Sequence, residues 1–253
     1  MKTARKILRF LDGTFTAVML LLLFLLGAYA GYALWDNHQV YSRVELQQSE
    51  LLELKPTAPE QDEEAEPQPI NFDHLLKINP DTLGWLSVGN TKIDYPLVQG
   101  QNNLYYVNTD FYGQTSLAGA IFLDTRCSGE MQSGYQLLYG HHMSNGLMFG
   151  DLDQFEDLRF FQENRTGELL TPEGAFSLEI FAFVMTETSD PYIFNPANAE
   201  KDLPRLMAYI REKAVHFRED AFADGEENPH LLAMTTCTGD YTDERIVVLA
   251  RIQ

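Results

Sequence analysis

The sequence predicts a mainly β fold, a β-barrel with helical additions, preceded by one transmembrane helix. Most segments after residue 70 are short, rich in β-branched and aromatic residues, and separated by turn residues, as in all-β proteins. Residues 203–214 break this pattern, because their apolar side chains recur at helical spacing. Residues 13–35 carry no charge and are numerous enough to cross a bilayer as a helix.

Composition narrows the classes of function. The chain has 253 residues, 45% of them apolar, which suffices for one sizeable core and a membrane segment. Its formal net charge of -19 argues against nucleic-acid binding and against peripheral binding to anionic membranes, since both need a basic face. Two cysteines, Cys127 and Cys237, do not form a disulfide framework.

The N-terminal region predicts a membrane anchor and its orientation. Residues 1–12 are basic, so we expect them to be cytoplasmic, with residues 13–35 as a transmembrane signal-anchor and the rest of the chain extracytoplasmic. Ala28, Tyr29 and Ala30 form a candidate cleavage site, so a cleaved signal peptide is the alternative. The apolar run continues past that site to Trp35, which favours an uncleaved anchor in the cell membrane.

A spacer is expected between the anchor and the folded domain. Residues 36–54 have scattered leucines and valines among polar residues, which is compatible with a short helical stalk. Residues 55–69 are rich in proline and glutamate without apolar periodicity, and this predicts an extended, disordered acidic linker. We therefore divide the chain into residues 1–12, 13–35, a stalk and linker over 36–69, and a folded domain over 70–253.

Within this domain the elements can be assigned in order. A short helix over residues 72–78 should end at Asn79-Pro80. Residues 85–88 and 92–95 flank a Gly-Asn turn, and Pro96 indicates that the continuation is an edge or a bend. The remaining strands are expected over residues 118–124, 135–139, a hairpin of 168–170 with 175–186, 231–237 and 245–250.

Three residues at strand ends suggest cysteine chemistry. Cys237 ends one strand, Arg245 begins the next, and residues 238–244 between them have turn chemistry. A nearby cation favours the reactive thiolate, and arginine can stabilise an oxyanion. His141 follows the strand over residues 135–139, and a histidine near a cysteine is the general-base arrangement of acyl transfer. The sequence shows no metal-ligand spacing, so we expect neither a metal nor a cofactor.

These residues resemble a known family, the sortases, which are membrane-anchored cysteine transpeptidases of Gram-positive bacteria. The resemblance is carried by Gly140-His141-His142-Met143, by Thr235-Thr236-Cys237 and by Arg245 opening the next strand, all in the order of the family. Residues 79–86 and 91–100 are similar to class B sortases. The resemblance implies a closed barrel of about eight strands with an N-terminal helix and a long helix inserted before the nucleophile strand. Class B members often have an acidic residue close behind the cysteine, whereas Thr238-Gly239 stands here.

The resemblance also implies a reaction. Cys237 would attack the threonine carbonyl of a sorting pentapeptide, Arg245 would hold the carbonyl oxygen, and His141 would protonate the leaving amine. The thioacyl group would pass to an amine, either a cell-wall precursor or a pilin lysine. Surface proteins or pilins with a C-terminal sorting motif would be the substrates, and we expect Thr235, Thr236 and Leu97 to contact them.

Two other classes of function remain open at this point. A cysteine hydrolase would use the same three residues with water as acceptor, and a non-catalytic surface binding module would make Cys237 structural. The sequence leaves open the sorting motif, the acceptor amine and the choice between wall anchoring and pilus polymerisation.

Overall fold

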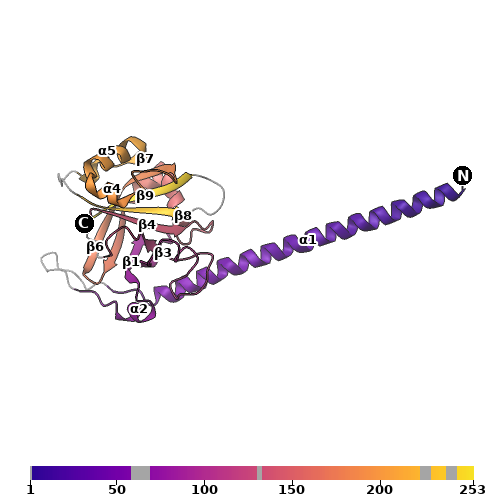
Figure 1. Ribbon diagram of the computed structural model, residues 1–253, viewed down its shortest axis with the longest axis horizontal. Helices are drawn as coiled ribbons and strands as arrows, with labels where there is room; N and C mark the ends of the chain where they lie inside the picture. The colour runs from indigo at the N-terminus through magenta and orange to yellow at the C-terminus, as the bar shows by residue number, and fades with distance from the viewer. Residues whose placement is uncertain (1, 58–68, 130–132, 223–228, 238–243) are drawn as a thin grey trace. The chain divides into compact units, whose positions relative to one another are not determined.

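The computed structural model describes residues 2–57, 69–129, 133–222, 229–237 and 244–253 (Figure 1). Its internal contacts divide the chain into two compact units, Met1–Leu46 and Gln47–Gln253. The described part of the first unit is helical and belongs to α1 (Lys2–Leu52). The second unit contains the end of α1 and all the strands and shorter helices of the described residues.

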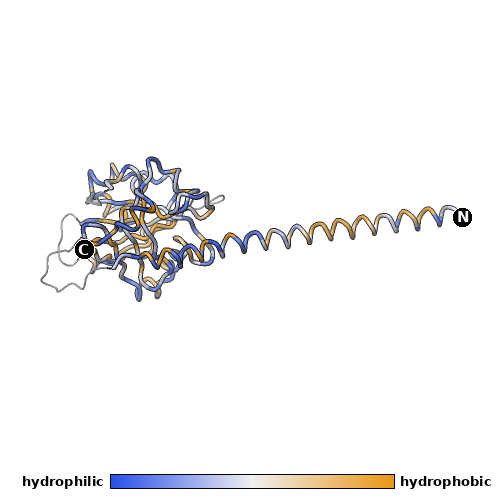
Figure 2. The backbone as a smooth tube through the Cα atoms, turned by 90° about the horizontal axis from the view of Figure 1, so that it is seen from below, coloured by the Kyte–Doolittle hydropathy of each residue, from blue (hydrophilic) through white to orange (hydrophobic). Residues whose placement is uncertain are grey.

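Helix α1 contains an apolar stretch whose side chains are exposed. Leu20, Leu23 and Phe24 are each more than half exposed, and Figure 2 shows this stretch in orange. Among the described residues, α1 is the one helix long and apolar enough to cross a membrane, with a mean hydropathy of 2.2 over its most apolar window. The expected linker falls largely on residues 58–68, which lie outside the described part of the chain.

Eight strands close into a barrel in the second unit, as the sequence resemblance implied (Figure 1). The order around the ring is β5-β1-β2-β3-β4-β8-β9-β6, and pairing of β5 with β6 closes it, while β7 joins the sheet at β6. The described strands are β1 (Thr82–Val88), β2 (Asp94–Val98), β3 (Ile121–Leu123), β4 (Tyr135–His141), β5 (Thr166–Thr171), β6 (Gly174–Glu187), β7 (Ala214–Phe217), β8 (His230–Cys237) and β9 (Glu244–Ile252).

Two of the pairings within the ring are parallel. They join β2 to β3 and β4 to β8, whereas the other named pairings are antiparallel. Parallel neighbours end at the same edge of a sheet, so the last residues of β4 and β8 lie side by side. This pairing determines where the functional site can form.

Short helices fill the connections between the strands. The connection from β6 to β8 is the most helical, since it contains α4, α5 and η2 in addition to the short strand β7. Pro196 and Pro204 lie in the first turns of α4 and α5, where a missing N–H costs no helical hydrogen bond. The helices after α1 are α2 (Asp73–Ile78), η1 (Gly150–Glu156), α3 (Leu158–Glu163), α4 (Pro196–Lys201), α5 (Leu203–Lys213) and η2 (Glu219–Phe222).

The core of the second unit is built from large apolar side chains. Trp85, Phe181 and Phe183 are fully buried, and the indole Nε1–H of Trp85 donates to Asp94 Oδ1 at 2.5 Å. Leu51, at the end of α1, belongs to the same apolar cluster as Trp85 and Phe72. The last turn of α1 is therefore part of the folded core of this unit.

Some of the strands and helices predicted from the sequence are confirmed, and others differ in their bounds or pairing. The hairpin of β5 and β6 and the helix α5 lie where they were predicted. Strand β4 continues through His141 instead of ending at residue 139, and β3 is shorter than expected. Of the two alternatives for Pro96, an edge or a bend, the edge is wrong, because β2 pairs with both β1 and β3; its pairing with β3 begins one residue after Pro96, at Leu97.

Candidate active site

His141 and Cys237 are the last residues of two neighbouring parallel strands. The register of β4 and β8 runs from Tyr135 opposite Leu231 to His141 opposite Cys237. The sequence placed each residue at a strand end but could not show that they meet. The backbone pairing brings them together at one edge of the barrel.

Arg245 lies at the same edge on the next strand. In the antiparallel pair of β8 and β9 the register runs to Thr235 opposite Val247, which lie two residues before Cys237 and two residues after Arg245. Arg245 is half-buried and also pairs with Thr186 on β6. Of the turn predicted over residues 238–244, residues 238–243 lie outside the described residues, and Glu244 belongs to β9 instead of the turn. Three adjacent strands, β4, β8 and β9, thus bring the backbone positions of His141, Cys237 and Arg245 to one end of the barrel.

Steric contacts explain why the residue before His141 is glycine. A Cβ atom at Gly140 would lie 2.5 Å from Ile121 Cδ1 and 2.7 Å from Phe149 Cδ2, closer than such contacts allow. Phe149 is fully buried, and its backbone N–H donates to the carbonyl of His141 at 2.9 Å. Gly140 therefore lets the chain after β4 fold back tightly and fix the backbone of His141.

The two adjacent histidines have different partners. His141 Nε2 lies 2.7 Å from the backbone carbonyl of Val107. Since a carbonyl oxygen can only accept, this nitrogen carries the proton. His142 instead pairs through Nε2 with Asp153 Oδ2 at 2.7 Å. Within the described residues, no group of three or more His, Cys, Asp or Glu side chains could hold a metal ion.

Cys127 lies in surroundings that suppress thiol reactivity. Its side chain is buried, and its Sγ lies 3.8 Å from the carbonyl oxygen of Tyr135. Burial raises the pKa of the Cys127 thiol to about 12. Because the thiolate is the nucleophilic form, this cysteine stays unreactive at neutral pH.

The three expected substrate contacts are buried. Leu97, Thr235 and Thr236 have 0% exposure, and the hydroxyl of Thr235 donates to the carbonyl of Ile246 at 2.9 Å. A side chain without exposed surface cannot touch a bound peptide unless its surroundings open. Their contact with substrate stays a prediction, and their observed surroundings favour a packing role.

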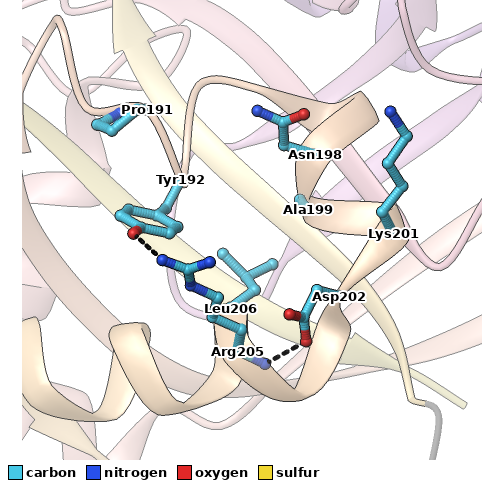
Figure 3. Close-up of a pocket in the computed structure, with 8 residues that line it drawn as sticks. All are labelled: Pro191, Tyr192, Asn198, Ala199, Lys201, Asp202, Arg205 and Leu206. Carbon is cyan, nitrogen blue, oxygen red and sulfur yellow. Dashed lines mark hydrogen bonds between the residues drawn. The ribbon is translucent and has the colours of Figure 1, made fainter.

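A pocket of about 370 Å³ lies between the segment after β6 and the helices α4 and α5. Figure 3 shows Tyr192 and Arg205 on one side of it and Asn198 and Lys201 on the other. The Arg205 guanidinium donates to the Tyr192 hydroxyl at 2.7 Å and lies 5.1 Å from the centre of its ring. A second hollow, of about 350 Å³, is lined by α5 residues and by Glu244, the neighbour of Arg245.

Asp190 holds the segment that lines both hollows. Its carboxylate accepts from the hydroxyls of Thr186 and Tyr209, at 2.8 and 2.5 Å, and from the backbone N–H groups of Tyr192 and Ile193. Burial by itself would raise the pKa of Asp190, but these hydrogen bonds outweigh it and lower the pKa below its ordinary value. Sequence reasoning missed this residue, although Asp before Pro in a turn-like segment was a usable signal.

An ion pair between a buried carboxylate and an exposed arginine ties the same segment to the β3–β4 connection. Asp124 has 0% exposure and accepts from Arg126 Nη2 at 2.6 Å and from the Tyr139 hydroxyl at 3.0 Å. Burial would raise the pKa of Asp124, but hydrogen bonds from Arg126 outweigh it and lower the pKa. Arg126 also donates to the carbonyl of Phe194 at 2.9 Å. Sequence patterns do not reveal this bridge, because Arg126 and Phe194 lie far apart along the chain.

Comparison with known proteins is consistent with this geometry. The family model of the sortase domain matches residues 86–253. Sortase B of Staphylococcus aureus (strain NCTC 8325 / PS 47) is 30% identical over 183 residues, which are 72% of this chain and 74% of that protein. A Streptococcus pyogenes class B sortase involved in pilus biogenesis is 36% identical with a TM-score of 0.66, over 72% of this chain and 98% of that structure.

A further solved structure holds a substrate. The Staphylococcus aureus sortase B–substrate complex superposes with a TM-score of 0.70 at 26% identity, over 86% of this chain and 98% of that one. The family match covers more than half of the chain, and the relatives are class B enzymes with the same barrel. The chain therefore belongs to the sortase family of cysteine transpeptidases.

Proposed function

We propose that this protein is a membrane-anchored class B transpeptidase that cleaves a sorting pentapeptide after its threonine and transfers the product to an amine. In this proposal Cys237 is the nucleophile, Arg245 stabilises the oxyanion and His141 is the general acid and base. The observation that carries it is the pairing of His141 with Cys237 at the ends of β4 and β8, with Arg245 two strands from His141.

The reaction follows from these positions. The Cys237 thiolate attacks the threonine carbonyl carbon, and the developing oxyanion is stabilised by the Arg245 guanidinium. The C–N bond then breaks as the imidazolium of His141 gives its proton to the leaving amine. The thioester is attacked by an incoming amine, which loses a proton to the imidazole and releases the Cys237 thiolate.

Substrate recognition is proposed to involve the segment from β6 to α5. Both hollows described above are lined by residues of this segment, and one of them includes Glu244 beside Arg245. Loops on a rigid scaffold commonly set specificity. Wall anchoring and pilus assembly differ in the acceptor amine, and the pilus role of the Streptococcus pyogenes relative makes a pilin lysine one acceptor to test.

The anchor is proposed to be the apolar part of α1, with residues 1–12 in the cytoplasm and the barrel outside the membrane. The support is the uncharged stretch over residues 13–35 and the basic residues that precede it. A peptide substrate on the cell surface would then share its compartment with the barrel.

The test uses residues 47–253, because Leu51 is part of the core of that unit. A library of sorting pentapeptides with Leu-Pro-x-Thr-Gly and Asn-Pro-x-Thr-Asn/Gly patterns is incubated with the protein, with and without triglycine. A ligated product that appears only with triglycine is expected. Cleavage at the same rate without any ligated product would instead identify a hydrolase.

A further inference from the structure

The imidazole of His141 is oriented by a backbone carbonyl. Its Nε2 lies 2.7 Å from the carbonyl oxygen of Val107, which lies in the connection between β2 and β3. The two carboxylates that follow this histidine most closely in sequence have other partners, since Asp151 accepts from the backbone N–H of Lys92 and Asp153 pairs with His142. We propose that the Val107 carbonyl orients the catalytic imidazole and that Gly119 is the residue that positions this carbonyl; the inference rests on the proposed role of His141.

The segment around Val107 is fixed on both sides. The backbone N–H of Ala120 donates to the carbonyl of Tyr106, and that of Ser116 donates to the carbonyl of Asn108, both at 3.0 Å. The Tyr106 side chain is buried, and its hydroxyl donates to Asp81 Oδ2 at 2.8 Å. The Val107 carbonyl between these anchors therefore has little freedom to move.

Gly119 packs directly against this carbonyl. Its φ of +59° lies in the left-handed region, which favours glycine. A Cβ atom built there would lie 2.3 Å from the carbonyl oxygen of Tyr106 and 2.6 Å from that of Val107. Both contacts are with backbone atoms, so a side chain at position 119 would push the acceptor of His141 out of place.

The hydrogen bond determines which ring nitrogen performs the chemistry. With Nε2–H donated to Val107, the neutral ring has its lone pair on Nδ1. Nδ1 then accepts the proton of the incoming amine as the new amide bond forms, and the Nδ1–H of the imidazolium protonates the leaving amine as the old C–N bond breaks. Nε2 keeps its proton throughout. A carbonyl supplies orientation in place of the carboxylate that plays this part in other catalytic sites.

Gly119 and Gly113, both in the connection from β2 to β3, provide a test position and a matched control. Gly113 also has a positive φ, +76°, but a Cβ atom there would meet nothing within 4 Å. Gly113→Ala therefore carries a similar backbone cost without touching Val107, whereas Gly119→Ala displaces the carbonyl. Misplacing a catalytic group by about 1 Å costs about 10²-fold in rate.

The first experiment compares both variants in residues 47–253. For Gly119→Ala, kcat with a sorting peptide and triglycine should fall about 10²-fold, while KM for the peptide stays within about twofold. Gly113→Ala should keep both values. A Gly119→Ala variant with the kcat of the wild type, or an equal loss in Gly113→Ala, would overturn the proposal.

The second experiment observes the hydrogen bond without any need for activity. In the wild-type protein with 15N-labelled histidine, the Nε2–H of His141, assigned by its loss in His141→Asn, should give an NMR signal protected from exchange with water. Gly119→Ala should lose this protection, and Gly113→Ala should keep it. An unprotected Nε2–H in the wild type would contradict the inference even if Gly119→Ala fails to fold. If Cys237→Ala stayed active, the proposed function would fail instead, while this signal would be unchanged.

Discussion

Among single residues, strand register and burial distinguish the two cysteines. Cys237 ends β8 and is paired with His141 at the end of β4, and Arg245 is the second residue of the neighbouring strand β9. Cys127 is buried, and burial raises its pKa to about 12. A thiol that ionises only at high pH contributes almost no thiolate at neutral pH. The two cysteines therefore differ in their surroundings: Cys237 is paired with a histidine at a strand end, whereas Cys127 is buried.

Arg245 gives the first prediction. Arg245→Lys keeps the positive charge but loses the planar fork that can hold a carbonyl with two donors. We expect kcat for ligation of a sorting peptide to fall about 10²–10³-fold, the usual effect of losing one oxyanion donor. Arg251, which donates to the carbonyl of Ala221, offers a control position on the same strand. A near-normal rate for Arg245→Lys would show that the residue supplies only positive potential.

Among the secondary-structure elements, the connection from β6 to β8 is the most helical connection of the barrel. It contains α4 and α5, lines two hollows and is held by Asp190 and by the Arg126 bridge. Asp190 joins neighbouring parts of this connection, including α5 through Tyr209, and Arg126 joins it to a segment far away in sequence. They fix the position of this connection relative to the strand ends that carry the proposed catalytic residues.

Specificity is predicted to follow this connection. Residues 198–217 would be exchanged for the equivalent segment of a class B sortase with a different sorting motif. The chimera should acquire the peptide preference of the donor, because α5 lines both hollows and one of them includes Glu244 beside Arg245. Preference is measured with the pentapeptide library, and folding by thermal unfolding. Unchanged preference in a well-folded chimera would make α5 a packing helix only.

Asp190 predicts a pH dependence of stability. Its pKa is lowered below the ordinary 3.8, so its charged form stabilises the fold above that pH, and this contribution is lost as the pH falls through the lowered value. Asp190→Asn should reduce the free energy of unfolding by about 2 kcal/mol at pH 7, since hydrogen bonds to charged groups are worth about 1.5–3 kcal/mol.

The measurement for Asp190 is urea unfolding of both proteins at pH 7 and at pH 3.5. The difference between them should shrink at the lower pH. Asp202, which caps α5 through the N–H of Arg205 at 3.1 Å, gives a control as Asp202→Asn, because asparagine caps helices about equally well. A pH-independent difference for Asp190→Asn would show that the charge of Asp190 does not stabilise this segment.

Sequence reasoning succeeded where the signal was local. The β5–β6 hairpin surrounds Pro172-Glu173-Gly174, and α5 has apolar residues at helical spacing, so both could be predicted. The short elements η1, α3 and β7 were missed, since a few residues give no reliable periodicity. The partner of His141 was also missed, because Val107 contributes a backbone carbonyl, and a carbonyl has no signature in the sequence.

At the scale of the whole molecule, one chain combines an apolar helix with a barrel of high negative charge. The basic residues Lys2, Arg5, Lys6 and Arg9 all precede the apolar stretch, and the formal net charge of the chain is -19. Basic residues next to a span are retained in the cytoplasm. We therefore expect the barrel to face outward.

This orientation can be tested in a Gram-positive host. Protease added to protoplasts that express the full chain should degrade the barrel, detected by an antibody to residues 70–253, and should spare an epitope tag placed before residue 1. Deletion of residues 13–35 should leave the barrel protected in the cytoplasm. A protected barrel in the full-length protein would reverse the proposed topology.

In the proposed reaction, Cys237 forms a thioacyl intermediate with a sorting peptide. Intact mass and peptide mapping of residues 47–253, after acid quenching of a reaction with the best library peptide and no amine, detect this intermediate. We expect an adduct on Cys237 that disappears when triglycine is added, is absent in Cys237→Ala and is retained in Cys127→Ala. An adduct on Cys127, or ligation by Cys237→Ala, would contradict the proposed reaction.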